Sequence, residues 1–272
     1  MTALNLIKKQ HEILVISDGA GYAQDGTLLS AASKVDLLPQ FSGFVMQSGG
    51  SAWTPAIVAI FGFFATDTDD LFDKAAGLLD VVQEKYQGIS AEPLGRVLFG
   101  GWSNERQEMR LGAVYSEEAS SLQQDGNGSE VILPDAYTLH EFEGDQLLTQ
   151  PPIGAQLWVD AMGGPVHDLS QITDVDEFAS NLLAAQRTIG MPFRGVGAFG
   201  QITRITQSES TVRIFERYDD KIGDVMMPLT FDWKARRAKR AIEAIGGIPE
   251  GMSPLKRRMM EKKAAKGKLR AV

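Results

Sequence analysis

The chain has 272 residues, of which 43% are hydrophobic and 23% charged, proportions typical of a globular protein with a buried core. It contains no cysteine, which excludes disulfide frameworks, thiolate metal sites and a thiol nucleophile. No segment approaches the ~20 consecutive apolar residues of a membrane span. We therefore expect a protein without a membrane partner.

Charge is distributed unevenly along the sequence. The last 40 residues contain thirteen Lys and Arg against three Glu, a net charge of +10, so the preceding 232 residues carry −18 of the total of −8. Such an asymmetry indicates an acidic body joined to a basic tail. We accordingly divide the chain into a globular domain, 1–232, and a basic extension, 233–272.

The first predicted elements are two short strands followed by a helix. The strands are HEILVISD (11–18) and GFVMQSGG (43–50), in which apolar runs end at polar residues or glycine. A buried helix follows in TPAIVAIFGFFA, with Thr54 as its N-cap and Pro55 in the first helical position.

A second helix and a strand pair complete the first half. Residues 69–87 place Leu and Ala on one helical face, and the segments 95–103 and 109–116 read as antiparallel strands joined by an Asn-Glu-Arg turn. This order differs from the alternating strands and helices of a Rossmann sheet. It predicts an α+β fold in which helices pack outside sheets.

The second half contains a polar loop, a helix, a hairpin and the tail. The loop spans 116–130, and the helix begins near Thr173 or Asp174 and stops at Gly190. Residues 201–219 alternate apolar and polar side chains around a Ser-Glu-Ser turn, which predicts a hairpin. The basic extension consists of two helical segments separated by GGIPEGMSP.

The N-terminal region carries residues at a distinctive spacing. Counting from Thr2, Asp18 lies 16 positions on, Lys34 lies 32 positions on, and Gly49-Gly50 lie 47 and 48 positions on. This pattern resembles the start of proteasome β-type subunits in the N-terminal nucleophile (Ntn) hydrolase family. It is most similar to the bacterial proteasome-related peptidase that is partnered by an ATP-dependent unfoldase. That family has its N-terminal Thr, the Asp of a GDG turn, its catalytic Lys and a GG turn at the same offsets, and here SDG replaces GDG.

The resemblance implies a four-layer αββα sandwich and a threonine peptidase or amidohydrolase that works in an oligomeric assembly on peptide substrates. In such a site, removal of Met1 frees an α-amine that takes the proton of the threonine hydroxyl as it attacks an amide carbonyl. A nearby ammonium keeps that amine neutral, and a carboxylate holds the ammonium in place. No cofactor and no metal are implied. The implied catalytic residues are Thr2, Asp18 and Lys34, the oxyanion donors are the backbone N–H groups of Ser48, Gly49 and Gly50, and Met46 lines the substrate pocket.

The second half departs from the family pattern. Active relatives have a GSG stretch before a helix and, later, an Asp two residues before a Ser, whereas the corresponding segments here are LLTQPPIGAQLW and RTIGMPFRGVG. Ala3 replaces a second hydroxyl residue, and a retained Met1 would acylate the α-amine. The alternative is therefore a catalytically silent structural or assembly protein with this fold, such as a component of a virus particle.

The basic extension suggests two partners. Its cations can dock on the acidic body of a neighbouring subunit, which drives self-association, or bind the phosphates of a nucleic acid. We favour the protein partner because the tail has Trp233 as its single aromatic residue, which gives little support for base stacking. The N-terminus lacks the features of a signal peptide, so we expect a location in the cytoplasm or within a virus particle. The tail contacts are assigned to Lys234, Arg236, Arg237, Arg240, Lys256, Arg257 and Arg258.

Overall fold

The computed structural model describes residues 3–85, 94–117, 123–124, 130–131, 135–164, 166, 168–190, 195–243, 252 and 254–264. Within these residues the chain forms two five-stranded antiparallel sheets, two small two-stranded sheets and helices outside them. The strands are β1 (Leu4–Lys9), β2 (Glu12–Asp18), β3 (Ala20–Tyr22), β4 (Leu28–Ala31), β5 (Val35–Leu38), β6 (Gly43–Ser48), β7 (Arg96–Ser103), β8 (Glu108–Tyr115), β9 (Gln123–Gln124), β10 (Glu130–Val131), β11 (His140–Glu141), β12 (Gln146–Leu148), β13 (Phe199–Thr206) and β14 (Ser210–Arg217). The α-helices are α1 (Thr54–Phe64), α2 (Thr68–Lys85), α3 (Ala155–Met162), α4 (Val175–Gln186), α5 (Trp233–Glu243) and α6 (Pro254–Ala264).

The two large sheets pack face to face. One has the strand order β12-β1-β2-β13-β14 and the other β11-β8-β7-β6-β5. The core between them contains Leu6 and Val15 from the first sheet and Phe44, Met46 and Leu98 from the second, all at most 1% exposed. Because alternate residues of a strand face opposite sides, each sheet also has an outer apolar face that must be covered.

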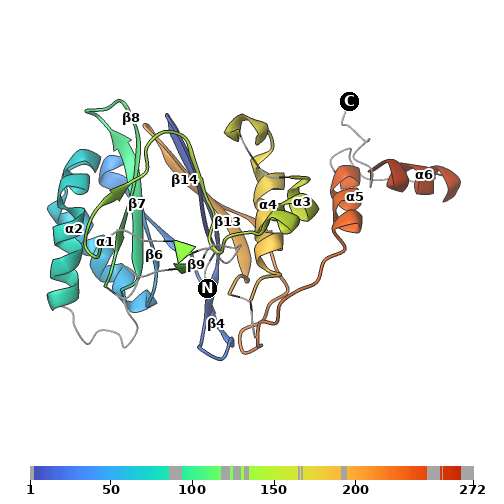
Figure 1. Cartoon of the computed structure of the whole chain (residues 1–272), viewed down its shortest axis with the longest axis horizontal. Coiled ribbons are helices and arrows are strands. Elements are labelled where there is room, and N and C mark those ends of the chain that lie inside the picture. The colour runs from blue at the N-terminus through green and yellow to red at the C-terminus, as the bar shows by residue number, and fades with distance from the viewer. Residues whose placement is uncertain are drawn as a thin grey trace.

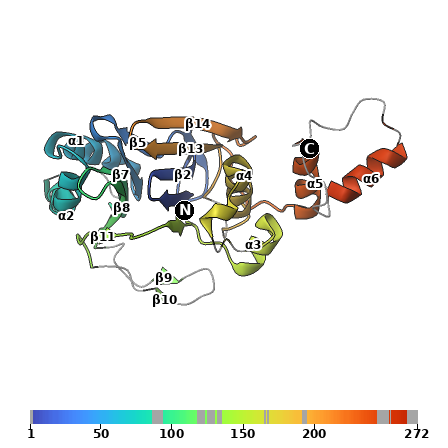
Figure 2. The same cartoon turned by 90° about the horizontal axis from the view of Figure 1, so that it is seen from above.

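Helices cover both outer faces (Figure 1). The α1 and α2 helices pack on the β5–β8 side through a core that includes Ile57, Phe61 and Phe99, whereas α3 and α4 pack on the β1, β2 and β13 side. In Figure 2, α1 and α2 lie at one end of the body and α3 and α4 at the opposite end, with the strands between them. The predicted α+β class, with helices packed outside sheets, is thereby confirmed, and the sheets are antiparallel.

Two predicted helix boundaries need correction. Thr54 is the first residue of α1 rather than its N-cap, because a short 3₁₀ turn at 51–53 leads into the helix and the Thr54 hydroxyl donates instead to Gln47. The α4 helix ends at Gln186, four residues before Gly190, and Asp174 caps its N-terminus by accepting a hydrogen bond from the Glu177 N–H. None of the helices in the described part of the chain has the length and apolar character needed to cross a bilayer.

The basic extension begins with a helix that is attached to the body. Trp233, the first residue of α5, packs against the core formed with α3 and α4, and Arg236 donates to both the carbonyl oxygen (3.2 Å) and the hydroxyl (2.9 Å) of Ser180 on α4. The α6 helix packs on α5 and extends away from the globular body (Figures 1 and 2).

Candidate catalytic site and cleft

Asp18, the last residue of β2, is the centre of a buried polar site. Its carboxylate is 0% exposed and accepts four hydrogen bonds. The donors are Lys34 Nζ at 2.6 Å, Ala3 N at 2.9 Å, Gly197 N at 2.9 Å and Ala20 N at 3.0 Å. One carboxylate therefore joins the first described residue of the chain to the segment before β5 and to the segment that enters β13.

Lys34 reaches this carboxylate from the residue immediately before β5. Its side chain is 14% exposed. Burial lowers the pKa of the Lys34 ammonium below its usual value, and the neighbouring Asp18 charge and hydrogen bond only partly oppose this effect. The pair provides a positive charge whose proton is held less tightly than that of a surface lysine.

Met1 and Thr2 lie outside the described residues. The chain is described from Ala3 onward, and the Ala3 nitrogen that donates to Asp18 is the peptide nitrogen bonded to Thr2. The expected contact between Asp18 and Lys34 is present, at the end of the strand pair β1–β2.

Further polar side chains extend the site into the space between the sheets. The Gln201 amide donates to the Ser33 hydroxyl at 2.9 Å and to the Thr203 hydroxyl at 3.3 Å. Ser17 is 0% exposed, and its hydroxyl has no hydrogen-bond partner among the described residues. Sequence pattern alone does not single out these residues, because hydroxyls and amides inside strands carry no distinctive spacing.

The Ser48-Gly49-Gly50 turn follows directly from β6. The Gln150 side-chain amide donates to the Ser48 hydroxyl at 3.4 Å, and Gly95 packs against the turn so closely that a Cβ there would lie 2.0 Å from the Ser48 carbonyl oxygen. Gly49 is exposed and lines a cleft. The turn is thus positioned by neighbouring backbone at the margin of an open space.

That cleft has a volume of about 530 Å³, which is within the usual range for small-ligand and peptide side-chain sites. It lies between the β3–β4 hairpin, the start of β5, the end of β6 and the N-terminus of α1. Its lining includes Lys34, Asp36, Gln47, Gly49 and Thr54. Because Lys34 contacts both the cleft and Asp18, the cleft adjoins the buried polar site.

Met46 does not line this cleft, which corrects the role that the resemblance implied for it. Its side chain is 0% exposed and packs between the two sheets. The neighbouring residue, Gln47, faces the opposite side of the same strand and lines the cleft instead.

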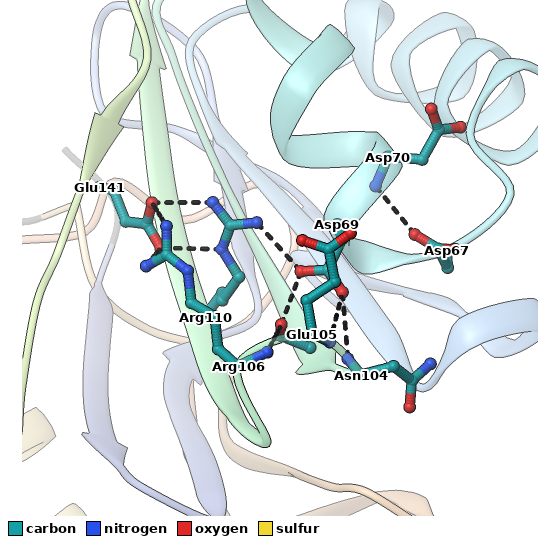
Figure 3. Close-up of polar contacts among 9 residues, drawn as sticks. Asp67, Asp69, Asp70, Asn104, Glu105, Arg106, Arg110 and Glu141 are labelled. Atoms are coloured by element: carbon teal, nitrogen blue, oxygen red, sulfur yellow. Dashed lines mark hydrogen bonds and ion pairs between the residues drawn. The ribbon is translucent and has the colours of Figure 1, made fainter.

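A second charged cluster, which shares no residue with the cleft lining, joins α2 to β8 and β11 (Figure 3). Arg110 on β8 donates two 2.8 Å hydrogen bonds to Glu141 and one of 3.1 Å to Asp69, and its guanidinium stacks over Phe72. Asp69 also accepts from the Ser103 hydroxyl and the backbone of the β7–β8 turn. These bonds satisfy every charge in the cluster, so we assign it to stability.

The described tail cations fall into two groups. Arg236 on α5 is 18% exposed and contacts Ser180 of α4, with its guanidinium 3.9 Å from the Glu216 carboxylate. Lys234 and Arg258 are exposed, and Arg257 pairs with Glu261 within α6. Arg236 thus has partners within its own chain, whereas the side chains of Arg237 and Arg240 are outside the described part. Lys256 is exposed on α6.

Over the described residues, no group of three or more His, Asp or Glu side chains is arranged to hold a metal ion.

Comparison with known proteins gives no match to any family model and none to any curated protein. Among solved structures, the fold is similar to that of the Anbu (Gly-1) mutant from Hyphomicrobium sp. strain MC1. The two chains share 14% sequence identity with a TM-score of 0.49, over 81% of this chain and 89% of the other.

Proposed function

We propose that the chain is a proteasome-like threonine peptidase of the N-terminal nucleophile type, with the four-layer αββα architecture of that family. One observation carries the proposal. The buried Asp18 carboxylate binds Lys34 and, at the same oxygen, the peptide nitrogen that is bonded to Thr2. The residue that follows Thr2 is thereby joined through Asp18 to a lysine of lowered pKa at the edge of an open cleft.

In the proposed reaction, loss of Met1 exposes the Thr2 amine and hydroxyl. The hydroxyl oxygen attacks a substrate carbonyl carbon while its proton passes to the amine, and the tetrahedral oxyanion is bound by backbone N–H groups of the turn at 48–50. Collapse breaks the C–N bond, and the departing amine takes the proton. A water molecule then hydrolyses the resulting ester, which returns the threonine hydroxyl and releases the acid.

Asp18 and Lys34 are assigned supporting roles in this scheme. The Lys34 ammonium lowers the proton affinity of the adjacent α-amine by charge repulsion, so that the amine is neutral and able to act as a base near neutral pH. Asp18 fixes the position of Lys34 through a charge-assisted hydrogen bond of 2.6 Å. Both effects require that the two side chains remain shielded from water, as they are here.

Intact-mass measurement combined with peptide hydrolysis tests the proposal. We expect the purified protein to lack Met1 and to cleave short peptide amides, and Thr2→Ala to abolish turnover while leaving the fold intact. Thr2→Ser is the matched control, since it retains a hydroxyl and an α-amine. A protein that retains Met1, or a Thr2→Ala variant that cleaves as fast as wild type, would contradict the mechanism and favour the catalytically silent alternative.

We further propose that the chain self-associates. The body carries −18 and the extension +10, and α1 exposes two adjacent aromatic side chains, Phe63 at 82% and Phe64 at 52%. Since Arg236 contacts its own body, we assign docking on a neighbouring copy mainly to the segment after α5, with the exposed Lys234 of α5 as a further contact. We retain 1–232 and 233–272 as the proposed division of the chain, with α5 anchoring the extension.

Light scattering over a range of salt concentrations tests this association. Exposed charge pairs are screened over ~8 Å at physiological ionic strength, so we expect the assembly to loosen in high salt and on deletion of residues 244–272. A particle mass that is the same under all these conditions rules out docking through the tail. If the deletion instead preserves the mass but lowers the affinity for DNA in a salt titration, the tail binds nucleic acid.

A further inference from the structure

The cleft beside the Asp18–Lys34 pair has a single unpaired charge. Among the residues that line it, Lys34 and Asp36 are the charged ones. The Lys34 charge is balanced by Asp18 at 2.6 Å. By contrast, the Asp36 carboxylate has no hydrogen bond or ion pair with any residue that the structure describes. The cleft therefore carries one uncompensated negative charge.

Strand geometry directs Asp36 into the cleft. Asp36 is the second residue of β5 and is flanked by Val35, which packs in the core between the sheets. Successive side chains of a strand alternate between faces, so Asp36 projects to the other side, toward α1. It pairs across the sheet with Val45, whose side chain belongs to the core under α1 and α2. The fold thus holds the carboxylate on a rigid strand.

Two polar side chains of the cleft wall are already committed to other partners. The Gln47 side-chain amide donates to the Leu94 carbonyl at 2.6 Å, and its oxygen accepts from the Thr54 hydroxyl at 2.9 Å. These bonds leave the Gln47–Thr54 wall of the cleft neutral and fixed. A ligand group that enters the cleft consequently finds Asp36 as the strongest electrostatic partner.

Asp36 is partly buried, so binding of a cation would stabilise its carboxylate. The side chain is half-buried, and burial raises the pKa of its carboxyl above the ordinary aspartate value. An entering ammonium or guanidinium group would offset that desolvation and supply charge-assisted hydrogen bonds. A neutral or acidic group would leave the carboxylate unpaired.

We infer that this cleft is a specificity pocket for a cationic side chain, and that the protein prefers peptides with Arg or Lys immediately before the cleaved bond. The position follows from the cleft lining, because Lys34 and Gly49 connect the pocket to the proposed reacting centre. The inference rests on the proposed function, since it names the substrate class of the same site. The pocket can nevertheless be tested without turnover.

Cleavage is measured on four short fluorogenic peptides that differ only in the residue before the bond, namely Arg, Lys, Leu or Glu. We expect kcat/KM for the Arg and Lys peptides to exceed that for the Leu peptide by at least about tenfold, the usual effect of one well-paired charge in a pocket. In Asp36→Asn, the ratio of kcat/KM for the Arg peptide to kcat/KM for the Leu peptide should fall close to one. The exposed Asp73 on α2 provides the control, because Asp73→Asn removes the same charge away from the cleft and should preserve the ratio.

Binding of agmatine, a guanidinium compound without a carboxylate, provides a readout that is independent of chemistry. We expect calorimetry to give a Kd at least about tenfold weaker for Asp36→Asn than for wild type and Asp73→Asn. Agmatine binding that depends on Asp36 without any peptide cleavage would retain the pocket and overturn the proposed peptidase function. If peptides were cleaved without a preference for Arg or Lys, and agmatine bound equally well to wild type and Asp36→Asn, the inferred cationic pocket would be wrong. The proposed peptidase function would then be retained.

Discussion

Asp18 and Lys34 form a 2.6 Å ion pair in which the carboxylate is fully buried and the lysine side chain is 14% exposed. Removing one member of such a pair leaves an uncompensated buried charge, which commonly costs about 3–5 kcal/mol. We expect Lys34→Met to lower the free energy of unfolding by about 3 kcal/mol, because three backbone N–H donors continue to stabilise Asp18. Urea unfolding at neutral pH measures the change.

The control for this substitution is Arg213→Met. Arg213 on β14 pairs with Asp176, but both side chains are about half exposed. An exposed pair contributes little to stability because water and salt screen it. If the two variants lost the same free energy of unfolding, the buried pair at Asp18 would have no special role in the fold.

Two glycines with opposite surroundings give a second prediction. Gly95 has a φ of +76°, and a Cβ there would lie 2.0 Å from the Ser48 carbonyl oxygen, so Gly95→Ala should lower the free energy of unfolding by at least about 2 kcal/mol. Gly77 lies in α2 with open space around it, so Gly77→Ala should raise that free energy by about 0.5–1 kcal/mol. Thermal unfolding of both variants checks these opposite signs. A tolerated Gly95→Ala would show that the turn at 48–50 can move.

The elements that the sequence predicted are those in which apolar residues recur at a regular spacing. The α2 helix buries Leu71, Ala75 and Leu79 on one face, and the β7–β8 and β13–β14 hairpins follow runs of apolar residues around polar turns. By contrast, β5 has four residues and β12 three, which is too short for a period to be recognised, and α3 is preceded by a proline-rich stretch that obscures its start. Long periodic elements are therefore predictable, whereas short edge strands depend on tertiary pairing.

The residues of the candidate site also differ in how far the sequence could predict them. Asp18 and Lys34 could be assigned because a charged residue at a fixed offset is visible in the sequence. Gly197 and Ala20 contribute backbone N–H groups to Asp18, and such donors depend on where the chain passes rather than on residue type. Met46 was misassigned because an offset from Thr2 does not determine which face of β6 a side chain occupies.

The Arg110 cluster predicts how stability responds to acid. Burial of Glu141 and Asp69 opposes their ionisation, yet hydrogen bonds, including those from Arg110, hold the pKa of both carboxyls below the ordinary values. A carboxyl with a lowered pKa in the folded state contributes stability above its unfolded pKa of about 4, and this contribution is lost as pH falls through the folded value. The free energy of unfolding of the wild type should therefore decline below about pH 5.

Arg110→Met isolates this contribution. Without the guanidinium, Glu141 and Asp69 keep a desolvation cost but lose their main cation, so we expect a loss of about 3–5 kcal/mol near neutral pH. In acid both carboxyls protonate in either protein, and the difference between wild type and variant should narrow. Urea unfolding at several pH values measures this difference in the free energy of unfolding. If this difference stayed constant or increased as the pH fell, Arg110 would not be what holds these carboxyls ionised.

The attachment of α5 predicts that two truncations of the basic extension have different effects. Truncation after Glu243 removes α6 but keeps the Trp233 contact with the α3–α4 core and the Arg236 hydrogen bonds to Ser180, so the melting temperature should change little. Truncation after Asp232 removes both contacts. Burial of a large apolar side chain contributes about 2 kcal/mol, and one kcal/mol shifts Tm by about 2–4 °C in a domain of this size, so the shorter protein should melt about 4–8 °C lower. Arg236→Ala in the full chain separates the two contributions, since it removes the Ser180 hydrogen bonds while leaving Trp233 in place. If both truncations melted at the wild-type temperature, α5 would not be anchored to the body, and all 40 residues of the extension would be available to a neighbouring copy.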